Sequence, residues 1–169
     1  MLNDQLMLRR RTWPASIGSL LLSVVICFGA AGLGAAATTS SVTSWYRTIL
    51  KPTWTPPDWI FGPVWTVLYL LMAVSAWLVW QSGRGTNCRR ALTWFGVQLG
   101  LNSLWSVLFF GLHRPGWAFA EILLLWLAIA ATAFEFRPHS VIAAWLLAPY
   151  LAWSSFAAGL NCVIWQMNS

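Results

Sequence analysis

Five stretches of nearly continuous apolar residues alternate with short polar or basic connections along the chain. Each is close to the ~20 residues that a helix needs to cross the hydrocarbon of a bilayer. They cover about 15–37, 59–81, 91–111, 116–135 and 140–165. Because hydrocarbon offers the backbone no hydrogen-bond partner, a spanning segment must be a helix or part of a closed barrel. Barrel strands alternate apolar and polar residues, whereas the stretch from Leu20 to Gly34 is almost continuously apolar.

The pattern therefore predicts an all-α integral membrane protein, a five-transmembrane-helix bundle in which residues 1–169 form a single domain. Composition agrees, because 59% of the residues are hydrophobic, 8% are charged and 14 are tryptophan. Such a composition excludes an ordinary water-soluble domain. Membrane lipids are the expected surroundings of the chain.

The net charge of +6 raises the question of nucleic acid binding. The basic residues lie at the ends of the apolar segments and not on one recognition element, so no nucleic acid partner is predicted. With five crossings, the N-terminus and the loops 82–90 and 136–139 share one side and carry seven Lys and Arg residues, against three on the other side. The positive-inside rule predicts a cytoplasmic N-terminus, with loop 38–58 and the C-terminus on the opposite side.

The first segment has a competing interpretation as a signal peptide, because Arg9-Arg10-Arg11 precedes it and Ala35-Ala36-Ala37 resembles a cleavage site. Its apolar run is long for a signal peptide, which favours retention as a membrane helix. The three cysteines have no close spacing, and the histidines His113 and His139 lie in short turns beside an arginine. Neither a disulfide framework nor a metal site is predicted.

The connection between the first two segments is unusual for a loop. It combines bulky amphipathic rings with prolines that fix φ, so the loop loses less freedom when it becomes ordered. We interpret loop 38–58 as a cover. Its aromatic residues and prolines are Trp45, Tyr46, Pro52, Trp54, Pro56 and Pro57.

The third segment separates polar and small residues on opposite faces when it is drawn as a helix. Gln98, Asn102, Trp105 and Phe109 form one narrow stripe. Polar residues are costly against lipid, so this stripe should point into the bundle. The opposite face carries the pair Gly96 and Gly100 in a GxxxG arrangement, which predicts a homodimer through this helix. The alternative is close packing of this glycine face against a helix of the same chain.

Two other segments also have one-sided stripes. The fifth carries Tyr150, Trp153, Ala157 and Asn161 on one face, and the second carries Trp65, Tyr69, Met72 and Ala76. Pro149 should bend the fifth helix, and the carbonyl it frees about a turn earlier needs a partner.

Glu121 is the one acid well inside a predicted segment. An ionisable residue in a membrane helix is a candidate functional group. The alternative is an interfacial carboxylate that extends toward Arg114.

Several spaced motifs together resemble the translocator protein family, whose members are also called tryptophan-rich sensory proteins or peripheral-type benzodiazepine receptors (TspO/MBR). The resemblance runs from about Trp45 to Trp165, in order and with the same loop placement. The residues that carry it are Trp45-Tyr46, Lys51-Pro52-x-Trp54-x-Pro56-Pro57, Trp65, Gln98-x-x-x-Asn102-x-x-Trp105, Phe109-Phe110-Gly111, Pro149-Tyr150-x-x-Trp153 and Gly159-Leu160-Asn161.

The resemblance implies a five-helix bundle, usually dimeric, that binds porphyrins such as protoporphyrin or haem and other hydrophobic ligands in a pocket under the first long loop. It implies no required cofactor. In some family members two pocket tryptophans are linked to light-dependent breakdown of porphyrin, and their counterparts here are Trp65 and Trp153. The implied ligand-binding residues are Tyr46, Pro56, Trp65, Tyr69, Gln98, Asn102, Trp105, Phe109, Trp153 and Ala157.

One departure from the family concerns the cholesterol-recognition motif of its animal members on the fifth helix. Cys162 and Gln166 stand here in place of the aromatic and basic residues of that motif, so cholesterol is not predicted as the natural ligand. A receptor or sensor that binds porphyrin is the leading expectation. The alternatives are a secondary transporter of tetrapyrroles or lipids, for which no internal repeat is visible, and a structural membrane dimer with a filled core. An enzyme with a nucleophile–base pair or a metal is not indicated.

Overall fold

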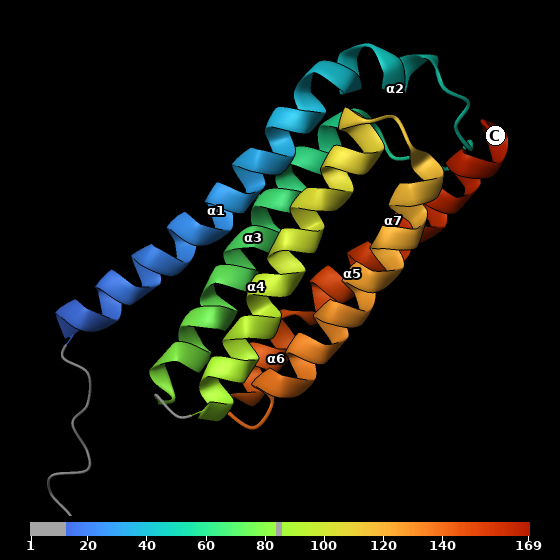
Figure 1. The fold of residues 1–169 in the computed structure, drawn as a ribbon. Coiled ribbons are helices and arrows are strands. Elements are labelled where there is room, and N and C mark those ends of the chain that lie inside the picture. Colours follow the sequence, from blue (N-terminus) through green and yellow to red (C-terminus); the bar gives the residue numbers. More distant parts are fainter. Residues whose placement is uncertain (1–12, 84–85) are drawn as a thin grey trace, which may run out of the picture.

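The computed structural model describes residues 13–83 and 86–169, and its elements are all helices (Figure 1). The basic residues Arg9, Arg10, Arg11 and Arg84, on which the predicted orientation depends, lie outside the described residues. The elements are α1 (Trp13–Thr43), α2 (Trp45–Thr48), α3 (Asp58–Gln81), α4 (Thr86–Ser106), the π-helix η1 (Val107–Gly111), α5 (Pro115–Phe136), α6 (Val141–Leu146) and α7 (Ala148–Met167).

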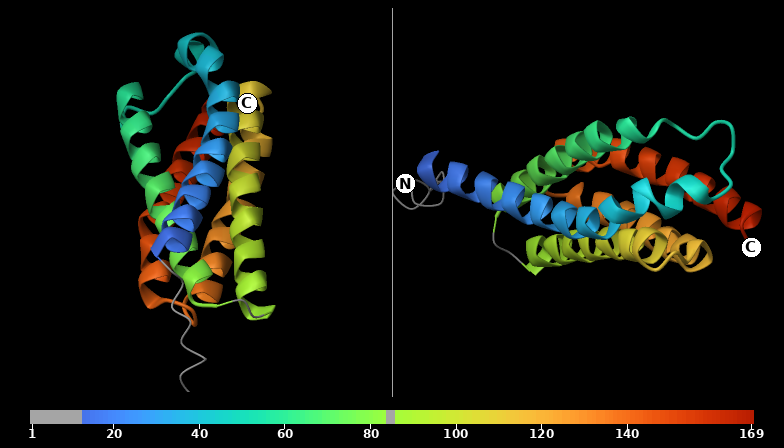
Figure 2. Two further views of the ribbon diagram at one scale, coloured as in Figure 1. Left: turned by 90° about the vertical axis from the view of Figure 1, so that its left-hand side faces the viewer. Right: turned by 90° about the horizontal axis from the view of Figure 1, so that it is seen from above.

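The long helices run side by side as one bundle, which Figure 2 shows from two directions, and their contacts close into a ring. Helix α1 packs against α3 and α4, α4 packs against α5, α5 packs against α7, and α6 packs against α3. The ring therefore runs α1, α3, α6 with α7, α5 and α4, and then returns to α1. The predicted all-α bundle is confirmed.

Within the part of the chain that the structure describes, four helices are long and apolar enough to cross a membrane: α1, α3, α5 and the α6–α7 pair. Helix α4 lies beside α1 and α5 in the same ring but is more polar. Its first turns contain Arg89 and Arg90, and its inner face contains Gln98 and Asn102. The basic first turns and the inward polar stripe together make the composition of α4 less apolar than that of the other long helices.

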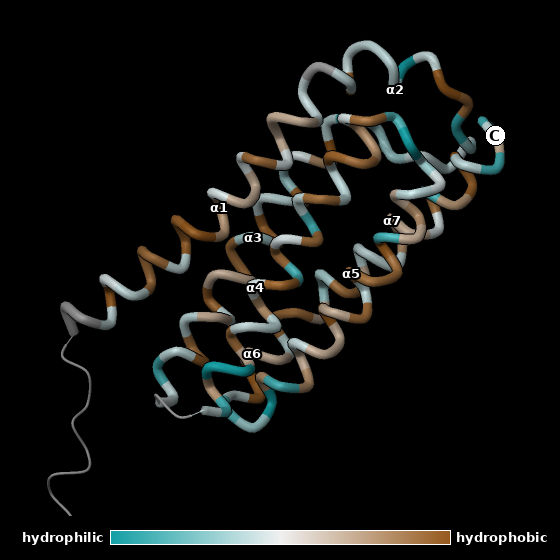
Figure 3. The backbone as a smooth tube through the Cα atoms, viewed as in Figure 1, coloured by the Kyte–Doolittle hydropathy of each residue, from teal (hydrophilic) through white to brown (hydrophobic). Residues whose placement is uncertain are grey.

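The outer surface of the ring is apolar, as expected for a surface that faces lipid. Leu21, Val25 and Leu33 of α1 are exposed, as are Leu127 and Phe134 of α5. Figure 3 shows hydrophobic residues along these helices, with hydrophilic residues gathered mainly at the ends of the bundle and in the connections. The N-terminal part of α1 extends beyond the other helices (Figure 2).

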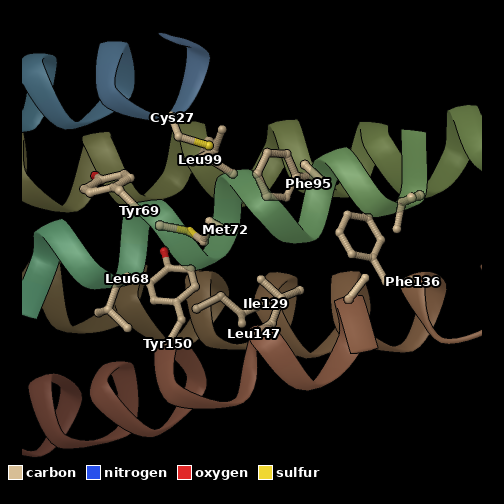
Figure 4. Close-up of a cluster of buried hydrophobic side chains, with 14 of the residues drawn as sticks. Cys27, Leu68, Tyr69, Met72, Phe95, Leu99, Ile129, Phe136, Leu147 and Tyr150 are labelled. Carbon is tan, nitrogen blue, oxygen red and sulfur yellow. The ribbon is translucent and has the colours of Figure 1, made fainter. Parts of the chain in front are cut away.

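The interior contains a buried apolar cluster to which all the long helices contribute (Figure 4). Met72 of α3 and Ile129 of α5 are fully buried, and the rings of Phe95 and Phe136 stack with centroids 5.9 Å apart. A dispersion-packed core of this kind holds helices together where lipid removes the hydrophobic driving force.

The helix boundaries differ from those expected in three places. Helix α1 extends to Thr43 and α2 follows, so much of the segment 38–58 is helical. The third segment begins at Thr86 instead of residue 91 and ends as a π-helix. The fifth is divided at Leu147, where Pro149 in the first turn of α7 supplies no N–H to continue α6.

The break between α6 and α7 leaves carbonyl groups without a helical partner. The Leu147 N–H donates to the Ala144 carbonyl at 3.2 Å, and the Ser75 hydroxyl of α3 donates to the Ala143 carbonyl at 2.7 Å. The predicted bend is therefore present, and a neighbouring helix supplies a donor to it.

Candidate functional site

The end of the bundle that carries α2 is closed by packed aromatic rings. Tyr46 of α2 is 4% exposed, and its ring centroid lies 6.3 Å from that of Phe109 and 5.6 Å from that of Phe110. Trp105 stacks on Phe109 at 5.3 Å, and Trp45 meets Phe109 edge-on at 5.7 Å. We call these five residues the aromatic cluster. Offset and edge-on pairs at such distances are favourable beyond the area that they bury.

The π-helix η1 positions two members of the aromatic cluster. Its wider turn is marked by the Leu112 N–H donating to the Val107 carbonyl at 2.8 Å and the Arg114 N–H donating to the Leu108 carbonyl at 3.0 Å. A π-helical turn changes the directions of successive side chains. Both Phe109 and Phe110 consequently face Tyr46.

Trp105 is held by a hydrogen-bond relay across three helices. Its indole Nε1–H donates to the Asn161 Oδ1 of α7 at 3.1 Å, and the Asn161 amide donates to the Pro115 carbonyl at the start of α5 at 2.8 Å. Helices α5 and α7 also approach closely here, because a Cβ on Gly116 would lie 2.9 Å from the Trp165 Nε1. The orientation of the Trp105 ring is therefore fixed by α5 and α7.

The segment before α3 is anchored to the bundle at two places. At one, the Ser41 hydroxyl donates to the Phe110 carbonyl at 2.6 Å, and the Trp45 ring stacks on His113 at 4.4 Å. His113 has a φ of 53°, a left-handed backbone conformation that histidine tolerates better than most residues. At the other, Asn168 accepts from the Leu50 N–H at 3.0 Å and donates to the Leu50 carbonyl at 2.9 Å.

Tyr46 is the residue of this segment that enters the bundle. The Lys51 ammonium lies 4.2 Å above its ring centroid and donates to its backbone carbonyl at 2.9 Å. Burial raises the pKa of the Tyr46 phenol to about 12, and the negative charge of Asp58 adds to the shift. The phenol is therefore neutral across the physiological pH range.

A small cavity lies beside the aromatic cluster, with a volume of about 30 Å³. That volume holds roughly one or two water molecules, so a larger ligand requires the lining side chains or the loop to move. Its lining residues come from α2, α3, α4, η1 and α7. They are Tyr46, Phe61, Trp105, Phe109, Phe110, Phe156, Ala157, Leu160, Asn161 and Ile164.

The structure divides the ligand-binding residues expected from the sequence into two groups. Tyr46, Trp105, Phe109 and Ala157 line the cavity. Pro56 is half-buried in the loop and is not among the lining residues. The other five, which we call the deeper group, lie on α3, α4 and α7 and are not lining residues: Trp65, Tyr69, Gln98, Asn102 and Trp153.

The deeper group is already packed and partly hydrogen-bonded. The Asn102 amide donates to the Tyr69 hydroxyl at 2.6 Å, and the Trp65 ring lies 5.7 Å from that of Tyr69. Trp153 lies between Phe61 and Phe156, at 5.8 Å and 5.3 Å. Trp65 and Trp153 are thus both embedded among other rings.

Six lining residues were not among the ligand-binding residues expected from the sequence, although Asn161 belongs to the stripe predicted on the fifth helix: Phe61, Phe110, Phe156, Leu160, Asn161 and Ile164. Phe156 and Leu160 follow Trp153 at spacings of three and seven, so the stripe predicted on the fifth helix could have been widened to include them. Phe110 had no such signal, because only the π-helical turn directs it inward.

Glu121 lies well below the surface of the bundle. Its side chain is 5% exposed, and neither carboxylate oxygen has a hydrogen-bond partner among the described residues. The alternative in which it extends toward Arg114 at the interface is therefore wrong. By contrast, Glu135 pairs with Arg90 at 2.8 Å at the other end of the bundle.

Comparison with known proteins agrees with this arrangement of helices and aromatic residues. The TspO/MBR family matches residues 23–166. Tryptophan-rich protein TspO of Archaeoglobus fulgidus is 40% identical over 91% of this chain and 99% of its own length. Translocator protein of Homo sapiens is 37% identical over 92% of this chain and 91% of its own. Tryptophan-rich sensory protein of Cereibacter sphaeroides is 39% identical over 82% and 87%.

The chain belongs to the TspO/MBR family. Family membership, together with the long apolar helices, makes it an integral multi-pass membrane protein with the five-helix bundle of that family.

The anchoring of the loop by the C-terminus can be tested with Asn168→Ala. This change removes both hydrogen bonds to Leu50, so we expect deuterium exchange of the 49–57 backbone to become about 5- to 10-fold faster, as for the loss of ~1 kcal/mol of local stability. Exchange measured by mass spectrometry gives the rate. Asn87→Ala, at an exposed position on α4, is the control. Equal exchange in Asn168→Ala and the unmodified chain would contradict the anchoring.

Proposed function

We propose that the chain binds a flat, largely apolar ligand of the porphyrin type, such as protoporphyrin or haem, between the aromatic cluster and the deeper tryptophans. The observation that carries the proposal is the cavity that α2 closes with Tyr46 over the rings of Trp105, Phe109 and Phe156. Rings of this kind stack on the faces of a conjugated ligand. The name tryptophan-rich sensory protein of a relative supports a receptor-like or sensory role.

Entry of such a ligand requires an opening. The cavity of about 30 Å³ is much smaller than the ~300–1,000 Å³ of typical ligand sites. The cover is held by a few hydrogen bonds and by the rings of Trp45 and Tyr46, whereas the long helices pack against one another around the bundle. Displacement of the cover is therefore the least costly way to open the cavity to a ligand.

Light-dependent breakdown of porphyrin is the variant of this function that would make the chain an enzyme. Trp65 and Trp153 are the residues proposed for it. Trp65 lies against Tyr69, and Trp153 lies against the cavity-lining ring of Phe156. Transport of tetrapyrroles is a second variant. Product formed under light, and porphyrin flux into sealed vesicles, separate these two variants from binding alone.

Protoporphyrin binding is tested by the quenching of tryptophan fluorescence. We expect saturable quenching by protoporphyrin, because the ligand would lie within a few ångströms of several indoles. The double variant Trp65→Phe with Trp153→Phe should weaken binding by about 10-fold or more, since base-like stacking on an indole contributes about 1–3 kcal/mol. Trp117→Phe, at a 72% exposed position, is the control. Quenching that does not saturate, or that is equal in the double variant, would count against the proposal.

We also propose a homodimer through α4, in the orientation that places the N-terminus in the cytoplasm. Gly96 and Gly100 are exposed, and a Cβ on either would meet nothing within 4 Å. The face of α4 that carries these two glycines is therefore open to a second copy of the chain in the described structure. Small residues allow two helix backbones to approach closely in lipid.

The dimer is tested by Gly96→Leu with Gly100→Leu. Two leucines would separate the helices, so we expect monomers in bilayers where the unmodified chain gives dimers, as measured by single-molecule photobleaching. Gly29→Leu, at another open glycine on α1, is the control. The same oligomeric state in the double variant and the unmodified chain would overturn the assignment of this face.

A further inference from the structure

Four polar side chains in the middle of the ring have buried atoms without a hydrogen-bond partner among the described residues. These atoms are the Gln98 Oε1 of α4, both carboxylate oxygens of Glu121 on α5, and the hydroxyls of Tyr150 and Ser154 on α7. Each side chain is at least 95% buried. Buried polar atoms are nearly always paired, because an unpaired one costs about 1–3 kcal/mol. Four such side chains therefore call for an explanation.

The four side chains come from helices that pack against one another. Tyr150 and Ser154 are one helical turn apart on α7, α7 packs against α5, which carries Glu121, and α5 packs against α4, which carries Gln98. The Gln98 amide donates to the Met72 sulfur at 3.8 Å, and Figure 4 shows the Tyr150 hydroxyl pointing toward Met72. Helices α4, α5 and α7 thus direct polar atoms to one region of the interior, which we call the polar floor.

The polar floor lies below the cavity, on α4 and α7, which line it, and on the neighbouring helix α5. Ser154 is three residues before Ala157, which lines the cavity. Glu121 is three residues after Ala118, which is buried in the apolar cluster that contains Tyr46 and Phe109. Three residues correspond to a rise of about 4.5 Å along a helix. A ligand that enters past Tyr46 therefore needs to extend about one turn further to reach Ser154 and Glu121, and about two turns further to reach Gln98 and Tyr150, which are seven residues from Trp105 and Ala157.

The chemistry of the polar floor favours a hydrogen-bond donor. The Gln98 amide nitrogen already donates to the Met72 sulfur, whereas its carbonyl oxygen has no partner among the described residues. Glu121 offers two further acceptor oxygens, and the two hydroxyls can each accept as well as donate. A carboxylate entering here would find no cation among the four side chains, and an ionised carboxylate in an apolar interior is costly without a partner. The basic residues Arg47, Lys51 and Arg114 lie at the loop end instead.

We propose that Gln98, Glu121, Tyr150 and Ser154 bind the N–H or O–H donor of an otherwise apolar aromatic ligand, with Glu121 as the main acceptor. This inference rests on the proposed function, since it assigns the deep end of the same ligand site. It fixes the direction of a ligand that carries an N–H or O–H donor at its edge: that donor enters first, and any carboxylates stay at the loop end. An internal water molecule is the competing source of such a donor, and the experiment distinguishes the two.

The test compares two probes of nearly equal shape, 2-naphthol, which has an O–H donor, and 2-methoxynaphthalene, which has none. Binding is measured by equilibrium dialysis against the full chain in lipid nanodiscs, with empty nanodiscs subtracted. We expect 2-naphthol to bind the unmodified chain about 10-fold more tightly, as for one buried hydrogen bond. Glu121→Leu should reduce this preference to less than about 3-fold, because both carboxylate oxygens are lost.

Two conservative variants keep the test decisive if Glu121→Leu does not fold. Ser154→Ala and Tyr150→Phe each remove one hydroxyl, and each should lower the preference for 2-naphthol by about 2- to 5-fold. The matched control is Ser155→Ala, one residue away, whose hydroxyl instead bonds to Trp126 and to its own helix. It should leave the preference unchanged.

Equal binding of the two probes to the unmodified chain would overturn the proposal and would indicate that water alone satisfies the polar floor. A preference for 2-naphthol that persists in both Glu121→Leu and Ser154→Ala would also overturn it, because the donor would then be bound elsewhere. If protoporphyrin still quenches tryptophan fluorescence in either case, only this inference fails. If neither protoporphyrin nor 2-naphthol binds, the proposed function fails with it.

Discussion

Hydrocarbon satisfies no hydrogen bond, and this single constraint explains most of the architecture. It requires helices wherever the chain crosses, and it directs polar side chains toward other protein atoms. The Ser75 hydroxyl donates to the Ala143 carbonyl at the α6–α7 break, and the Asn102 amide donates to Tyr69. The exception is the polar floor, where Glu121 and its neighbours have atoms without a partner among the described residues. Where a membrane protein leaves polar atoms unpaired, function is the first explanation to test.

The aromatic end of the bundle and the polar floor are parts of one arrangement. Helices α4 and α7 contribute to both: Trp105 and Gln98 come from α4, and Asn161 and Ser154 come from α7. The Trp105–Asn161–Pro115 hydrogen bonds fix the upper part of this space, while the cover above it is held by Ser41, Trp45 and Asn168. Helices joined by these hydrogen bonds, beneath a cover held at two anchors, are suited to a ligand that must enter from one end.

The sequence predicted the features of the molecule that depend on the periodicity of apolar and polar residues. The period of the apolar residues identifies five helices, and the stripe of Gln98 and Asn102 correctly points inward because both are buried. It also separates Gly96 and Gly100 onto the exposed face. The sequence did not predict features that depend on local backbone geometry. The π-helix η1 is only five residues long, which is too short to leave a periodic pattern in the sequence, so the inward direction of Phe110 was not expected. The contact of Asn168 with Leu50 was not expected either, because it joins positions 118 residues apart.

The central claim is that the segment between α1 and α3 is a cover that must be displaced before a ligand reaches the interior. Replacing Leu50 and Asn168 with cysteine, in a Cys162→Ser background, allows the two anchor positions to be joined by a short reducible cross-linker. The rate at which protoporphyrin quenches tryptophan fluorescence after mixing then measures ligand entry. A cover predicts entry slowed on the order of 10-fold in the linked protein and restored when the linker is cleaved. Equal rates with the linker intact and cleaved would contradict it.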